Sequence, residues 1–315
     1  MKNISEILEN VKTVGIGGHI RPDGDCIGSC MALYLNIRKY FPDIEADVYL
    51  EDRKPVFDYI DRMDEVKTEA EEDKVYDLFI TCDVSALDRL AVARKYFDAA
   101  KKTACIDHHA SNDGYADYNY ILPKASSASE VLYDLLDEDL IDKSIAEPMY
   151  MGIAHDSGVF RFQSTTPKTM RIAANMIEKG VNVNMILEET FFRKTYNQMM
   201  VTAKIQSEAV LALDGKCIYG YCTSEMMEEY GVTTKDLDAV VASIRNVDGV
   251  EVAMFLYQLS EDSYKVSLRS KNYVDVSKIA VENGGGGHVR AAGAEIHGEL
   301  NDIINKLLNR IKQDI

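Results

Sequence analysis

The sequence of 315 residues lacks the features that mark membrane and secreted proteins. No apolar run approaches the ~20 residues that a membrane-spanning helix needs. Residues 1–6 do not begin the long apolar stretch of a secretory signal. We therefore expect a cytoplasmic protein that has no membrane partner.

The cysteines lack the Cys-x-x-Cys spacing that is typical of redox and metal motifs. There are six of them, and most lie inside apolar stretches: Cys26, Cys30, Cys82, Cys105, Cys217 and Cys222. This pattern favours reduced cysteines in a protein core, as is usual in the cytosol.

Positive charge is scarce, with 35 Lys and Arg residues against 52 Asp and Glu residues and a net charge of −17. This balance excludes the broad basic surface that long nucleic acids require, so we expect no long double-stranded partner. It does not exclude a small phosphorylated ligand that local cations hold. The length is sufficient for two domains, each with its own core.

Short apolar segments alternate with helical patterns in the first part of the sequence. We predict strands at residues 11–17, 44–50, 76–83 and 103–106. Helices are predicted at residues 25–40 and 126–140, and from residue 143 into the segment that contains Asp156. The alternation predicts an α/β domain with a mostly parallel sheet.

Acidic and histidine residues follow the ends of the predicted strands. Ligands of parallel α/β sheets bind beyond the carboxyl ends of the strands, so we expect these side chains to converge. Carboxylates that meet in one site repel one another unless cations neutralise them. The sequence therefore predicts divalent metals and phosphate chemistry. The candidate ligands are His19, Asp23, Asp25, Asp83, His108 and Asp156.

Each candidate segment also has a structural alternative. Asp25 precedes a predicted helix, where acidic residues often cap the N-terminus. Asp83 could be a turn residue, Asp156 could belong to a polar helix end, and the triplet at residues 107–109 could be a solvated turn. Their joint occurrence favours the metal centre. His155 and His297 are assigned no role.

A second domain is predicted to begin near residue 214, after a helical pattern over residues 167–213. It should contain strands at 217–222, 250–259 and 264–269, and helices at about 224–247 and 274–282. Four glycines at 284–287 then precede His288 and Arg290.

The glycine run is a candidate anion site. Successive glycines allow backbone N–H groups to converge on an anion, and the neighbouring His288 and Arg290 can add charge-assisted hydrogen bonds. The alternative is a flexible surface turn. Arg269, at a predicted strand end, is a further phosphate candidate, with a solvated strand end as its alternative.

In this order the motifs resemble those of the DHH phosphoesterase superfamily, which is named for a triplet such as Asp107-His108-His109. Residues 284–288 and 290–293 resemble the DHHA1 substrate-binding module. The combination is most similar to the oligoribonuclease and pAp phosphatase (nanoRNase) subgroup. The resemblance implies a DHH catalytic domain at residues 1–193, a helical connector at 194–213 and a smaller α/β DHHA1 domain at 214–315. It also implies an active site in the cleft between the domains.

The resemblance assigns roles to the candidate residues. His19 and Asp23 are expected to bind one metal, Asp25, His108 and Asp156 the other, with Asp83 bridging both. Asp107 is expected to orient a histidine, and His109 to face the scissile phosphate. Substrate is expected to contact Arg269, Gly286, Gly287, His288 and Arg290. The carboxylate-rich ligand set favours two Mn²⁺ ions, with Fe²⁺, Co²⁺ and Mg²⁺ as open alternatives.

The expected activity is two-metal hydrolysis of short oligoribonucleotides to mononucleotides, and of 3′-phosphoadenosine 5′-phosphate (pAp) to AMP. One alternative is a phosphodiesterase for cyclic dinucleotides or their linear products. A soluble inorganic pyrophosphatase is less favoured because the glycine-rich segment suits a nucleotide. A non-catalytic nucleotide sensor is less favoured because no ligand position is lost. The sequence allows a homodimer but does not determine the oligomeric state.

Overall fold

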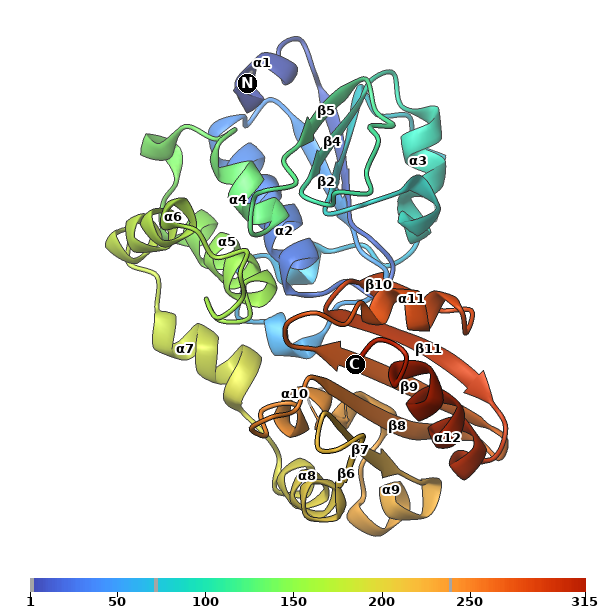
Figure 1. The fold of residues 1–315 in the computed structure, drawn as a ribbon. Coiled ribbons are helices and arrows are strands. Elements are labelled where there is room, and N and C mark those ends of the chain that lie inside the picture. Colours follow the sequence, from blue (N-terminus) through green and yellow to red (C-terminus); the bar gives the residue numbers. More distant parts are fainter. Residues whose placement is uncertain (1–2, 71–72, 238–239) are drawn as a thin grey trace. The chain divides into compact units, whose positions relative to one another are not determined.

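The computed structural model describes residues 3–70, 73–237 and 240–315 (Figure 1). Contacts divide the chain into a first unit, Met1–Arg193, and a second unit, Lys194–Ile315. Each unit has its own hydrophobic core. Within the described residues, no helix combines the length and apolar character needed to cross a membrane.

The first unit contains a five-stranded sheet in the order β2-β1-β3-β4-β5, and all neighbouring strands are parallel. Four of the strands were predicted, and the edge strand β5 was not. β3 is buried along its whole length, as expected for a strand in a sheet that is covered on both faces. The strands are β1 (Thr13–Gly17), β2 (Glu45–Tyr49), β3 (Leu78–Cys82), β4 (Thr103–Asp107) and β5 (Tyr118–Ile121).

Helices pack around this sheet. They are α1 (Ile4–Ile7), α2 (Gly24–Tyr40), α3 (Arg94–Ala99), α4 (Ala128–Tyr133), α5 (Lys143–Asp156), α6 (Pro167–Glu178) and α7 (Val183–Leu187), followed by a π-helix at Glu188–Phe192. The helix predicted at 126–140 is too long, because α4 ends at Tyr133. Asp137 then caps a separate 3₁₀ turn at Glu138–Leu140.

Two glycines allow α2 and α5 to pack closely. A Cβ atom on Gly28 would lie 2.4 Å from the carbonyl oxygen of Pro148. A Cβ on Gly152 would lie 2.1 Å from Ser129 Oγ and 2.8 Å from Asp25 Oδ1. Neither position has room for a side chain, so the two helices approach backbone to backbone.

The second unit contains a six-stranded sheet in the order β10-β11-β9-β8-β7-β6, in which only β7 and β8 pair in parallel. Its strands are β6 (Val210–Ala212), β7 (Cys217–Cys222), β8 (Val252–Ser260), β9 (Ser263–Ser270), β10 (Gly286–His288) and β11 (Ala291–His297). Its helices are α8 (Tyr196–Glu208), α9 (Ser224–Tyr230), α10 (Val240–Ile244), α11 (Val276–Val281) and α12 (Leu300–Ile311).

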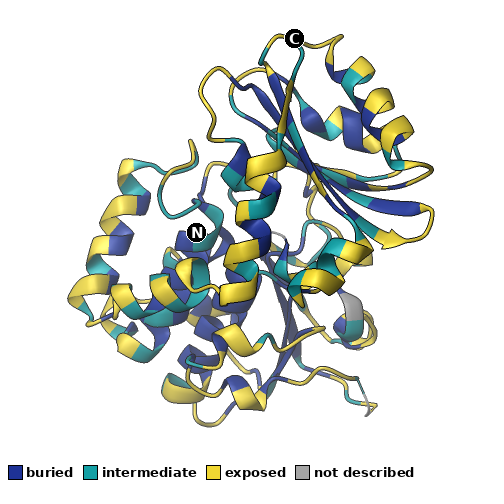
Figure 2. Cartoon of the chain, turned by 90° about the horizontal axis from the view of Figure 1, so that it is seen from below, coloured by how far each residue is buried: buried dark blue, intermediate teal, exposed yellow. Residues whose placement is uncertain are grey.

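Alternate residues of β8 enter two cores on opposite faces of this sheet. Met254 packs in the core that includes α11 and α12, whereas Phe255 packs in the core that includes α8 and α10. Buried residues accordingly concentrate in the strands and on the inner sides of the helices (Figure 2). The α/β class predicted for both parts of the chain is confirmed, and all six cysteines are buried and free of disulfides.

Candidate metal centre and substrate face

The loop after β1 positions two of the candidate ligands. Asp23 caps the N-terminus of α2, because its Oδ1 accepts hydrogen bonds from the backbone N–H groups of Asp25 and Cys26 at 3.1 and 3.2 Å. The ring of His19 lies with Nδ1 2.7 Å from the carbonyl oxygen of Ile20. A hydrogen bond from Nδ1–H to this carbonyl leaves a lone pair on Nε2.

The lone pair of His19 faces carboxylates. Its Nε2 is 3.4 Å from Asp83 Oδ2 and 3.8 Å from Asp23 Oδ1. Asp83 directly follows β3 and has a left-handed backbone with φ of 60°. Its backbone N–H donates to the carbonyl oxygen of Ile106 at 3.0 Å, which holds the strained residue in place.

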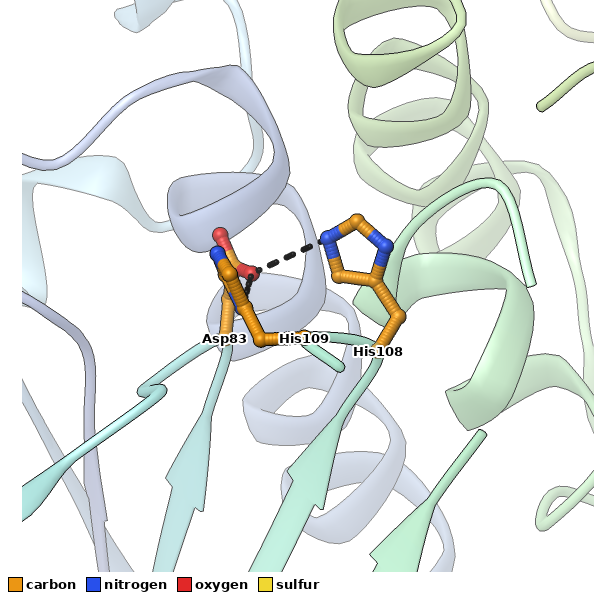
Figure 3. A group of neighbouring side chains, drawn as sticks. All are labelled: Asp83, His108 and His109. Carbon is orange, nitrogen blue, oxygen red and sulfur yellow. Dashed lines mark ion pairs between the residues drawn. The ribbon is translucent and has the colours of Figure 1, made fainter. Parts of the chain in front are cut away.

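The other oxygen of Asp83 faces the histidines that follow β4 (Figure 3). Asp83 Oδ1 is 3.6 Å from His108 Nε2 and 3.6 Å from His109 Nδ1. His108 Nε2 is also 3.1 Å from Asp156 Oδ2, at the last residue of α5. Asp83 therefore stands between His19 on one side and the two histidines on the other.

Asp107 supports His109. The buried carboxylate places Oδ1 2.8 Å from His109 Nδ1 and accepts a hydrogen bond on Oδ2 from Asn112 Nδ2 at 2.6 Å. Although burial opposes ionisation, these hydrogen bonds lower the pKa of Asp107. An ionised Asp107 fixes the proton of His109 on Nδ1 and the direction of its ring.

Asp25 is held by the start of α4. Its Oδ2 and Oδ1 accept hydrogen bonds from the backbone N–H groups of Ala128 and Ser129 at 2.5 and 3.0 Å. Burial and the nearby charge of Asp156 raise the pKa of Asp25 to about 7. Burial and Asp25 likewise raise the pKa of Asp83 well above its ordinary value. Two of the converging carboxylates thus resist ionisation unless positive charge enters the site.

In the second unit, strand pairing sets which candidate substrate residues share a face. His288 of β10 lies opposite Ala291 of β11, and Ala291 lies opposite Arg269 of β9. Directly paired residues project from the same face of a sheet, so Arg269 and His288 flank the small Ala291 about 10 Å apart. Gly286 and Gly293 form the next row of this face. We call this area, formed by Arg269, Gly286, His288, Ala291 and Gly293, the substrate face.

Arg290 does not belong to the substrate face. Its guanidinium donates hydrogen bonds to the carbonyl oxygens of Asn272 and, at 2.8 Å, of Val274. It therefore ties the segment after β9 to the segment before β11.

The last two glycines of the run lie in a strand, and Gly284 lies in the turn before it. Gly286 and Gly287 are part of the edge strand β10. A Cβ atom on Gly285 would lie 2.1 Å from the carbonyl oxygen of Gly293. A Cβ atom on Gly287 would lie 2.5 Å from the carbonyl oxygen of Ala291. Close approach to β11 accounts for these two glycines.

Known protein families match both units. Residues 13–153 match the N-terminal domain of the DHH family, and residues 214–314 match the DHHA1 domain. The first unit therefore carries a DHH-family domain, and the second unit carries a DHHA1 domain. The resemblance to a DHH protein that carries a DHHA1 module is therefore confirmed, and with it the assignment to the phosphoesterase enzymes of this family.

Curated relatives of this DHH protein align over nearly their whole length. The bifunctional oligoribonuclease and PAP phosphatase NrnA of Thermus thermophilus is 29% identical, over 100% of this chain and 94% of that protein. The protein of the same name from Bacillus subtilis is 28% identical, over 90% of each chain. The crystal structure of an exopolyphosphatase-related protein from Bacteroides fragilis has a TM-score of 0.88 and 21% identity, and it covers 98% of this chain and 95% of that one. This last likeness shows the shared fold.

DHH phosphoesterases depend on metals, and the residues of the DHH domain fit such ions. Asp83 Oδ1 and His108 Nε2 are buried without a hydrogen-bond partner, although acceptor atoms surround them. Donor atoms of one octahedral ion lie about 3.0 Å apart when each is ~2.1 Å from the metal. Donor atoms that face one another at 3.1–3.8 Å are therefore spaced as ligands of a shared cation.

The donor atoms form overlapping groups within 4.8 Å. One group is His19, Asp23 and Asp83, and another is Asp25, His108 and Asp156. All six sequence-predicted ligands are thus brought together in the DHH domain.

His155, to which the sequence analysis gave no role, is also at this centre. Its Nδ1 lies 3.3 Å from Asp156 Oδ1 and 4.0 Å from Asp23 Oδ2. The sequence signal for His155 was its position directly before Asp156. Adjacent residues of a helix point in different directions, so this position alone did not indicate that both side chains face one site. The ring of His155 reaches Asp23 because Gly24 has no side chain. A Cβ atom on Gly24 would lie 2.7 Å from the imidazole.

Proposed function

We propose that this DHH protein is a two-metal phosphoesterase that hydrolyses short oligoribonucleotides to mononucleotides and pAp to AMP. The observation that carries the proposal is the position of Asp83, whose two oxygens face separate groups of histidines and carboxylates. A carboxylate placed in this way can bridge two ions. Full-length alignment with relatives named oligoribonuclease and PAP phosphatase supports the choice of substrate class.

We assign one divalent ion to His19, Asp23 and Asp83, and the other to Asp25, His108 and Asp156, with Asp83 shared. The predominance of carboxylate oxygen over imidazole nitrogen favours Mn²⁺. When bound, the ions activate a water molecule and neutralise the phosphoryl oxygens. Asp25 is pre-oriented by the N–H groups of Ala128 and Ser129, so it can ligate without reorganising.

His109 is proposed to contact the scissile phosphate. The carboxylate of Asp107 is 2.8 Å from His109 Nδ1, which assigns the ring proton to that nitrogen and the phosphate contact to Nε2. Asn112 donates to the other oxygen of Asp107 and keeps the acid from rotating away. Asp107 is therefore a positioning residue for His109.

The substrate face of the DHHA1 domain is proposed to bind the part of the substrate that is not cleaved. Arg269 and His288 offer cationic or hydrogen-bonding groups to a phosphate, and the small residues between them leave space for it. Open space lies over Gly286, where a Cβ would meet no atom within 4 Å. Gly287 and Arg290, also predicted from the sequence, would act by shaping β10 and its neighbouring segment.

A product-resolved assay tests the proposal. Purified protein with Mn²⁺ is incubated separately with pAp, the linear dinucleotide pApA, cyclic di-AMP and pyrophosphate. We expect phosphate and AMP from pAp, and AMP from pApA. Intact pAp and pApA would overturn the proposal. Faster cleavage of cyclic di-AMP than of pAp and pApA would favour the cyclic-dinucleotide phosphodiesterase. Rapid cleavage of pyrophosphate would favour the pyrophosphatase.

These substrates are small and soluble, so we propose that the protein acts in the cytoplasm without a membrane partner. The net charge of −17 agrees with short rather than long nucleic-acid substrates. Analytical ultracentrifugation separates a monomer from the homodimer that the sequence allows.

A further inference from the structure

A strained turn follows the last metal-site residue of α5. Gly158, Val159 and Phe160 have φ angles of 58°, 56° and 61°, all in the left-handed region. This region is unfavourable for residues that have a Cβ, and most so for β-branched Val159. Strain of this kind persists only where the surroundings enforce it, and it concentrates at functional sites.

Buried Ser157 enforces the turn. Its Oγ accepts a hydrogen bond from the N–H of Phe160 at 3.0 Å. Its carbonyl oxygen accepts hydrogen bonds from the N–H groups of Arg161 and Phe162 at 3.0 and 2.9 Å. A further hydrogen bond of 2.7 Å runs from the N–H of Val159 to the carbonyl oxygen of Ala154. The turn is thus tied to the end of α5.

The rings of Phe160 and Phe162 lie in different environments. Phe160 packs against the core of the first unit, with its ring 5.8 Å from that of Tyr150. Phe162 instead remains 45% exposed. Its ring lies directly on Gly158, since a Cβ there would be 2.5–2.6 Å from three of its ring carbons. The absence of a Cβ on Gly158 leaves room for one face of this exposed ring.

The turn that carries this ring directly follows the metal-site residue Asp156 in the chain. Gly158 is two residues from Asp156, so their Cα atoms are at most about 7 Å apart. A nucleotide whose phosphate occupies the metal centre extends its base over a comparable distance. An exposed aromatic ring is a stacking surface for any base, because every base has a π face.

We propose that Phe162 is the platform on which a nucleobase of the substrate stacks. The inference rests on the proposed function, since it names how that site recognises a nucleotide in preference to a simple phosphate ester. Stacking tolerates different bases and so suits an enzyme for short oligoribonucleotides of mixed sequence.

The chain contains no tryptophan, so Phe162→Trp introduces a single fluorescent reporter. We expect AMP, in the presence of Mn²⁺, to quench its emission, and ribose 5-phosphate to leave it unchanged. The matched control is Met170→Trp on α6, at a residue that is 51% exposed. Its emission should respond to neither compound.

Kinetics provide the second readout. Phe162→Ala should raise KM for pAp about 5- to 100-fold and leave kcat nearly unchanged. Ribose 3,5-bisphosphate, which is pAp without the base, should show the same KM with both proteins. Phe162→Tyr retains a ring and should restore the KM for pAp. Equal melting temperatures of the variants exclude a loss of folding.

The outcomes separate this inference from the proposed function. A wild-type protein that leaves pAp and pApA intact contradicts the function, while AMP-specific quenching at position 162 would still support the platform. Active wild-type protein with an unchanged KM in Phe162→Ala and no quenching in Phe162→Trp overturns the platform alone. Quenching by ribose 5-phosphate as strong as that by AMP also overturns it.

Discussion

At the scale of single residues, the proposed metal centre depends most on Asp83, because its oxygens face both groups of candidate ligands. We expect Asp83→Ala to lower kcat by more than about 100-fold. Loss of residues that only orient a ligand already costs 10- to 100-fold in affinity or activity, and Asp83 is placed to bind both ions directly. Steady-state kinetics with pAp at saturating Mn²⁺ measure the effect.

Asp88→Ala is the control for this substitution. Asp88 is an exposed acid on the short 3₁₀ turn that follows Asp83, so its removal changes the net charge equally. Its kcat should match that of the wild-type protein. Near-normal turnover in Asp83→Ala would contradict the bridging role.

The sequence predicted that the candidate ligands lie together, but not the contacts that support them. Strand ends locate Asp83 and His108, because the carboxyl ends of parallel strands meet at one edge. The packing of the helices could not be predicted in this way, because the local sequence does not indicate that Gly152 lies against Ser129 and Asp25. The cap that the sequence offered for Asp25 is in fact Asp23, which caps α2 and also faces His19.

At the scale of secondary-structure elements, the pairing of β10 with β11 predicts a contrast among three successive glycines. Gly285→Ala and Gly287→Ala should each destabilise the second unit by about 1–3 kcal/mol, because their Cβ atoms would overlap the backbone of β11. Gly286→Ala should leave stability unchanged, since its Cβ would point into open space. Thermal unfolding measures all three, and equal melting temperatures would contradict the observed pairing.

The segment that follows β9 depends on a buried carboxylate. Glu251 accepts hydrogen bonds from the backbone N–H groups of Asn272, Tyr273 and Val274 at 2.8–3.1 Å. Although burial opposes ionisation, these bonds lower the pKa of Glu251. A pKa below the unfolded value stabilises the fold above about pH 4.3, and this stabilisation is lost as the pH falls through the native pKa.

We therefore expect Glu251→Gln to lower the stability of the second unit by about 1–3 kcal/mol at pH 7, because one acceptor oxygen is lost. The difference from wild type should shrink below about pH 4, where Glu251 itself becomes protonated. Melting temperatures over this pH range test it. Glu261→Gln, at an exposed acid in the β8–β9 turn, is the control and should melt like wild type at every pH.

Among the elements, the buried central strands were the most predictable and the short edge strands the least. β1, β3 and β4 are apolar runs, and the candidate residues His19, Asp83 and Asp107 lie at or within two residues of their ends, so the sequence indicated these strands. The edge strand β10 consists of two glycines and a histidine, a composition that indicates a turn. Its strand conformation depends on pairing with β11, which is a tertiary contact that local sequence does not encode.

At the scale of the whole molecule, the two units have separate cores, and the six proposed metal ligands all lie in the first unit. Calorimetry of the full chain should therefore resolve two transitions, of which Mn²⁺ raises only one. At 100 times the dissociation constant, one bound ion adds about 2.7 kcal/mol, which corresponds to a shift of about 5–10 °C for a unit of this size. EDTA should reverse the shift.

Two variants assign the transitions. Asp83→Ala should abolish the response to Mn²⁺, and its metal-free protein should melt above metal-free wild type because one buried, mutually repelling carboxylate is gone. Glu251→Gln should lower only the transition that does not respond to Mn²⁺. A single transition that both Mn²⁺ and Glu251→Gln shift would show that the units unfold together, and it would contradict their independence.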